Sequence, residues 1–187
     1  MRTPHLFLLE LGRLLRSRIV LVILALTLLS PLAGLTVYRP LLSTSTSGYV
    51  TTMLGTYLAN PALAAGVVGG ALFALLTLLE LDRVHRSRTD QLLDAILSPL
   101  TAALIRLWAL LCLSLMVLMA MLLVWLPYTR HAAGAVFDGE TYVLAYLIFF
   151  FPALPLSVLA AAAAYQFTRR FDLSAVLYLA FAALSLS

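Results

Sequence analysis

The sequence contains no lysine, because all 12 of its basic residues are arginines. The phosphate-binding loop of ATPases requires a lysine that reaches the β- and γ-phosphates of the nucleotide. This chain cannot supply that residue. Any ATP that drives the protein is therefore expected to bind another subunit.

Residues that carry catalytic chemistry are also scarce. A single cysteine, Cys112, excludes a disulfide within the chain, and the three histidines are spread along the sequence. Neither a His-Glu-x-x-His helix nor a Gly-x-Ser-x-Gly elbow is present. An enzyme needs convergent nucleophiles, bases or metal ligands. We therefore expect no enzyme, and no catalytic, cofactor-binding or metal site in this chain.

Charged residues are scarce as well. Charged residues make up 11% of the chain and hydrophobic residues 63%, whereas a soluble domain carries about 25% charged residues. The apolar residues form long blocks, and about 20 of them are needed to cross a membrane as a helix. These blocks predict an all-α integral membrane protein with one transmembrane domain over residues 1–187. The expected spans are 19–38, 61–80, 103–127, 141–167 and an incomplete fifth at 173–187.

The arginines set the expected orientation. With the N-terminus in the cytoplasm, ten arginines lie inside and two, Arg39 and Arg130, lie outside, as the positive-inside rule requires. The same placement explains the net charge of +4 without a nucleic-acid partner. Residues 4–18 are expected to form an amphipathic helix on the cytoplasmic face, with Leu8, Leu11 and Leu15 on its apolar side.

Two features inside the spans concern packing and shape. Small residues let helices approach closely, so Gly66, Gly69 and Gly70 predict a packing face, within the subunit or at a dimer contact. Pro152 and Pro155 lack backbone donors, and they predict a kink in the fourth span.

The segment between the second and third spans is the most informative. Ser87 and Asp90 have the spacing of a helix-capping box, and apolar residues then repeat at helical spacing. We predict a short amphipathic helix over about 87–98. Acidic side chains are poor partners for an anionic membrane surface, so its polar face is expected to contact a protein. The residues expected to dock are Asp90, Gln91, Leu92, Leu93, Asp94, Ile96 and Leu97.

This segment resembles the coupling helix of type-2 ATP-binding-cassette (ABC) exporter permeases. The resemblance rests on Glu80, the arginines of 83–88, the Leu92-Leu93 pair and Ser98-Pro99, together with the interfacial stretch 10–18. It implies a permease subunit in the bacterial cytoplasmic (inner) membrane that exports a substrate. The implied partners are ABC ATPase subunits, which bind ATP and magnesium, a second permease subunit and the lipid bilayer.

The family has six spans and an outer re-entrant element between the last two. The sequence stops inside its fifth span, so we expect an incomplete permease fold or one completed by another subunit. A channel would show polar rings or a filter loop, and the sequence has neither. A non-catalytic membrane scaffold, which needs only packing faces, is the alternative function.

Overall fold

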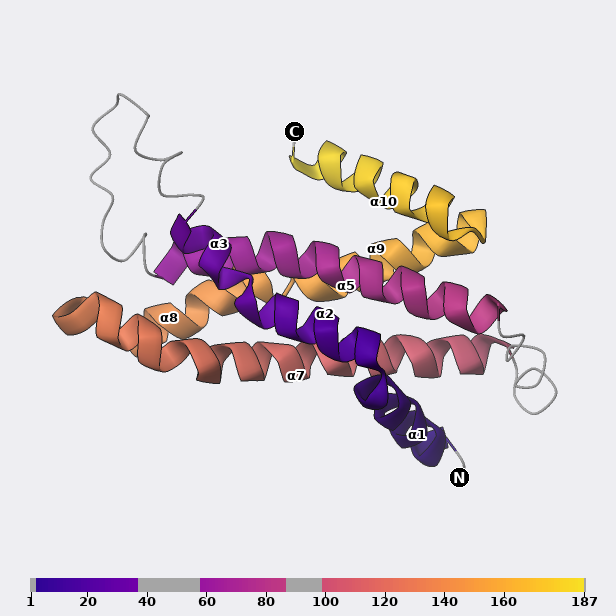
Figure 1. Ribbon diagram of the computed structural model, residues 1–187, viewed down its shortest axis with the longest axis horizontal. Coiled ribbons are helices and arrows are strands. Elements are labelled where there is room, and N and C mark those ends of the chain that lie inside the picture. Colours follow the sequence, from indigo (N-terminus) through magenta and orange to yellow (C-terminus); the bar gives the residue numbers. More distant parts are fainter. Residues whose placement is uncertain (1–2, 37–57, 87–98, 187) are drawn as a thin grey trace.

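The computed structural model describes residues 3–36, 58–86 and 99–186, and these residues form helices with no strand among them (Figure 1). The docking residues proposed between 90 and 97 lie outside this part. In chain order the elements are α1 (Thr3–Arg16), α2 (Arg18–Leu29), α3 (Pro31–Thr36), α5 (Asn60–Arg86), α7 (Pro99–Ala133), η2 (Gly134–Val136), α8 (Gly139–Ala145), η3 (Tyr146–Phe150), α9 (Ala153–Thr168) and α10 (Phe171–Leu186).

Four helical stretches are long and apolar enough to cross a membrane: Arg18–Leu35, Asn60–Arg86, Leu100–Ala133 and Gly139–Thr168. They identify the chain as a multi-pass membrane protein. Large apolar side chains such as Leu123, Ile148 and Leu179 are more than 60% exposed on the outside of the bundle. In water such a surface would be costly, whereas in a bilayer it faces lipid. The last helix, α10, has 16 residues, fewer than the about 20 that a span needs.

The first span is broken at Ser30 and Pro31, between α2 and α3. Proline has no N–H for the carbonyl of Thr27, one turn earlier, and the Ser30 hydroxyl donates to that carbonyl instead, at 2.6 Å. The indole N–H of Trp125 on α7 donates to the Leu28 carbonyl at 2.8 Å. Side chains therefore satisfy carbonyls at the break, as hydrocarbon surroundings require.

The fourth span changes its winding before Pro152. Residues Tyr146–Phe150 form a π-helical turn, in which the Phe151 N–H donates to the Tyr146 carbonyl at 2.9 Å. A turn at Phe151 and Pro152 follows, and α9 begins at Ala153. The rings of Tyr142, Tyr146 and Phe150 are all buried along this stretch, and each contacts the next in a tilted or edge-to-face arrangement.

The helix α5 lies at the centre of the bundle, and a larger share of it is buried than of any other span (Figure 1). It contacts α2, α3, η3, α9 and α10. The helix α1 instead packs on α7, with Leu14 as its fully buried side chain. This arrangement brings α1 beside the C-terminal end of α5.

Candidate functional site

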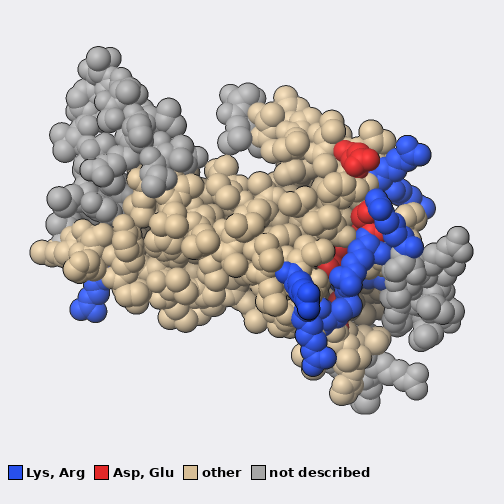
Figure 2. All heavy atoms as spheres, viewed as in Figure 1, with Lys and Arg blue, Asp and Glu red and all other residues tan. Residues whose placement is uncertain are grey.

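Most arginines of the described chain gather at one end of the bundle, which we call the basic end. Figure 2 shows them there, around the C-terminal end of α5, and a separate basic residue at the opposite end. The described arginines of the basic end are Arg13, Arg16, Arg18, Arg83, Arg86, Arg106, Arg169 and Arg170. Arg130 lies near the other end of α7.

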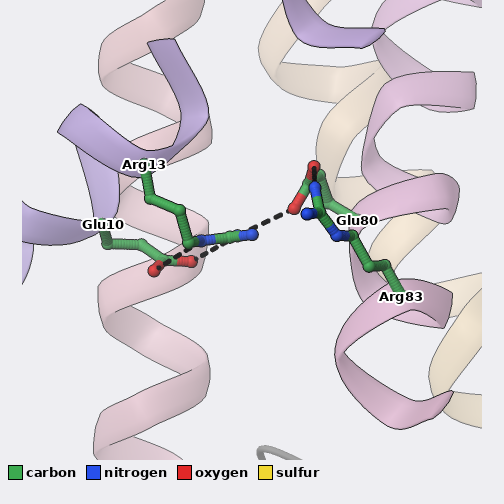
Figure 3. A network of polar contacts seen from close by, with 4 residues as sticks. All are labelled: Glu10, Arg13, Glu80 and Arg83. Atoms are coloured by element: carbon green, nitrogen blue, oxygen red, sulfur yellow. Dashed lines mark hydrogen bonds and ion pairs between the residues drawn. The ribbon is translucent and has the colours of Figure 1, made fainter. Parts of the chain in front are cut away.

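A network of four charged residues ties α1 to α5 at the basic end (Figure 3). Arg13 donates two hydrogen bonds to Glu10 on its own helix, at 2.8 and 3.1 Å, and one to Glu80 on α5, at 2.7 Å. Arg83 approaches the other oxygen of Glu80 at 3.6 Å. One guanidinium thus bridges two carboxylates from different helices, and Arg13 and Glu80 are 67 residues apart in sequence.

Glu80 is the most deeply placed member of this network. Its side chain is 8% exposed, against 37% for Arg13. Burial lowers the pKa of the Arg13 guanidinium, but the hydrogen bonds and charges of Glu10 and Glu80 outweigh burial and leave the pKa raised. Arginine stays protonated in any case, so Arg13 keeps its positive charge at physiological pH. The contact between Arg13 and Glu80 therefore attaches α1 to α5.

The sequence did not reveal this contact. In the amphipathic helix predicted over residues 4–18, Glu10 and Arg13 fall on the polar face, opposite Leu8, Leu11 and Leu15, and Glu80 falls at the end of the predicted second span. In the structure that polar face meets the buried Glu80. The sequence offered an acidic residue at the end of an apolar span and an arginine on the N-terminal helix. These two residues alone do not show that they pair with each other.

The three glycines predicted as a packing face lie on α5, and all three are buried. A Cβ at Gly66 would overlap the carbonyl group of Phe149, with its carbon 3.1 Å away. A Cβ at Gly70 would lie 2.8 Å from the Ser157 hydroxyl, and one at Gly69 would lie 3.0 Å from the Phe150 ring. These positions face η3 and α9 of the same chain.

Two hollows accompany these contacts. A cleft of about 570 Å³ at the basic end lies between α5, α7 and α9, and its polar lining includes Thr77, His85, Arg106, Gln166 and Arg169. A larger groove of about 860 Å³ lies between α5, α9 and α10, with an almost wholly apolar lining. At that groove the Tyr178 hydroxyl donates to Ser157 at 3.2 Å.

Across residues 3–36, 58–86 and 99–186, no three His, Cys, Asp or Glu side chains come together as metal ligands.

The segment with the predicted docking residues connects the end of α5, at Arg86, to the start of α7, at Pro99. It therefore begins about two helical turns after Glu80 in sequence.

Comparison with models of known protein families, with curated proteins and with solved structures found no match to this chain. The structure itself identifies a helical, multi-pass membrane protein whose basic end joins α1 to α5 through buried charge.

Proposed function

We propose that this chain is the membrane-spanning permease subunit of an ABC exporter, coupling ATP hydrolysis by a separate subunit to movement of a substrate. The observation that carries the proposal is the bridge from Arg13 to Glu80. In such a transporter, a force from the ATPase must reach several helices at once, and Glu80 of this bridge lies on the helix that leads into the predicted docking segment.

The contact between Arg13 and Glu80 would transmit a force from the ATPase between helices. A movement at 87–98 acts first on the end of α5, to which the segment is joined at Arg86. Because Glu80 holds Arg13, α1 moves with α5. Since α1 also packs on α7 and continues into α2 after Ser17, the first three spans are linked at the basic end. On this proposal the basic end is cytoplasmic, as the arginine bias requires.

The glycine contacts extend the linked group to the fourth span. Gly66 and Gly70 bring α5 close to η3 and α9, at the Phe149 carbonyl and the Ser157 hydroxyl. Closely packed helices have low compressibility and transmit displacement. The π-turn and the proline turn at Phe151 and Pro152 then mark where the fourth span can bend.

A non-catalytic membrane scaffold is the second candidate. The apolar groove of about 860 Å³ between α5, α9 and α10 favours it, because a helix of another protein could pack there. A scaffold would need no ATPase.

Co-purification separates the two functions. The tagged chain is extracted gently from native membranes, and the eluate is searched for a soluble protein with a phosphate-binding loop. The permease proposal expects such an ATPase, and expects Leu93→Arg or Ile96→Arg to release it. Phe167→Arg is the matched control, because Phe167 is 85% exposed near the end of α9 and outside the docking segment.

An ATPase that stays bound to Leu93→Arg would remove the docking segment from the proposal. If no ATPase elutes with intact, folded protein, the permease function is rejected and the scaffold takes its place.

A further inference from the structure

A third hollow, of about 520 Å³, lies at the basic end between α1 and α5. Its lining consists of Leu8, Leu9, Gly12, Arg13, Arg16, Ser17 and Arg83. All of these except Ser17, which follows α1, and Arg83 on α5 lie on one stripe of α1, because residues four apart are neighbours on a helix. The hollow therefore combines three basic side chains with the apolar side chains of Leu8 and Leu9.

The charges around the hollow do not cancel. Arg13 and Arg83 are held by Glu10 and Glu80, which gives two cations for two carboxylates. Arg16 is exposed and has no carboxylate partner among the described residues. The group as a whole carries a net charge of +1, which one phosphodiester would neutralise.

Gly12 lies in the middle of the lining stripe. Glycine inside a helix costs about 1 kcal/mol relative to alanine, and usually a close neighbour explains it. Here a Cβ at position 12 would meet no atom of the described chain within 4 Å. Packing within the described structure therefore gives no reason for a glycine, whereas the open hollow does.

The apolar part of the lining limits the occupant. Leu8 and Leu9 are 61% and 70% exposed, and they lie about two helical turns, or about 11 Å, before Arg16. An amphiphile with an anionic head and a hydrocarbon chain matches this order, whereas a free phosphate would leave the leucines uncovered. Because the chain spans a membrane, phospholipid surrounds it.

We propose that this hollow is a binding site for the headgroup of an anionic phospholipid. The phosphate is held by Arg16, with Arg83 and Arg13 adding positive charge, and the upper acyl chain covers Leu8 and Leu9. Gly12 leaves room for the headgroup against α1. The proposal is independent of the transporter function, since it uses the hollow and the membrane alone.

The test measures lipid binding to the full chain in a neutral detergent. Native mass spectrometry counts the adducts formed with dioleoyl-phosphatidylglycerol, with dioleoyl-phosphatidylcholine and with inorganic phosphate. Arg16→Gln removes the unpaired cation, and Gly12→Leu fills the hollow without changing any charge. Arg18→Gln is the matched control, because Arg18 is also exposed at the basic end but does not line the hollow.

One basic residue near anionic lipid contributes about 1 kcal/mol, which corresponds to about fivefold in affinity. We expect Arg16→Gln and Gly12→Leu each to weaken phosphatidylglycerol binding by about fivefold or more, with Arg18→Gln unchanged. Unchanged thermal unfolding would show that the variants are folded.

Three results would overturn the proposal. Equal losses for Arg18→Gln and Arg16→Gln would mean diffuse attraction to the basic end. Full phosphatidylglycerol binding by Gly12→Leu would place the lipid elsewhere. Phosphate adducts as frequent as phosphatidylglycerol adducts would exclude a lipid site.

Discussion

Removing Arg13 should destabilise the protein more than removing its partner Glu80. In Arg13→Gln, the carboxylate of Glu80 stays buried at 8% exposure and loses its hydrogen bond of 2.7 Å. In Glu80→Gln, the buried charge itself is gone, and Arg13 keeps both of its hydrogen bonds to Glu10. The asymmetry follows from which charge is left without a partner.

The magnitudes follow from burial. Breaking a fully buried ion pair by removing one partner costs about 3–5 kcal/mol. Arg13 is 37% exposed, and Arg83 remains 3.6 Å from Glu80, so water and a second cation reduce this cost. We expect about 2 kcal/mol for Arg13→Gln and about 1 kcal/mol for Glu80→Gln. The double variant should cost about 2 kcal/mol, less than the sum, because the two residues act on each other.

The assay is reversible unfolding by sodium dodecyl sulfate in mixed micelles, followed by tryptophan fluorescence. Arg86→Gln is the control, because Arg86 forms an ion pair with Asp82 but is 77% exposed. Such exposed pairs contribute about 0–1 kcal/mol, so this variant should unfold almost as the parent does.

Two outcomes would refute the reasoning. If Arg13→Gln costs no more than Glu80→Gln, the carboxylate is not left unpaired in the way that the structure implies. If the two single costs add in the double variant, the contact between α1 and α5 contributes nothing to stability.

Three further predictions use the same assay or circular dichroism. Gly66→Ala should destabilise the fold despite its better helix propensity, because its Cβ would overlap the Phe149 carbonyl, whereas Gly12→Ala, with open space, should not; equal effects would contradict this. Trp125→Phe should cost about 1 kcal/mol, since it removes the donor to the Leu28 carbonyl, and no loss would show that the bond is dispensable. Hydrogen bonds from the side chain and N–H of Thr141 lower the pKa of Asp138, so its carboxylate stabilises the start of α8 above the ordinary value of 3.8 and loses this effect as the pH falls through the lowered pKa; Asp138→Asn should abolish that acid-dependent fraying.

The class of the protein followed from the sequence because hydrocarbon imposes a strict condition on the backbone. Every buried N–H and C=O must be paired inside the membrane, so a long apolar run must be a helix. The four spanning helices lie where the apolar blocks are. The end of each span was less determined, and α5 continues to Arg86, beyond the expected end at residue 80, because a helix can extend past the apolar region into polar surroundings.

The sequence could name special residues in the spans but not their neighbours. Gly66 and Pro152 were identifiable from residue type, since the backbone consequences of glycine and proline are local. That Gly66 meets Phe149, and that a π-turn precedes Pro152, depends on how α5 and the fourth span are placed side by side.

What the sequence by itself determined was a helical membrane protein with its arginines at the ends of apolar blocks. Those properties depend on the free energy of transferring each segment from water into lipid. Each segment's own composition sets that free energy, independently of the other segments. Only the tertiary structure decided that Glu80 is buried against Arg13 and that Arg83 of α5 borders the same hollow as Arg16 of α1. Charge pairing and hollow formation depend on distances between helices that are far apart in the chain, and those distances are fixed by packing.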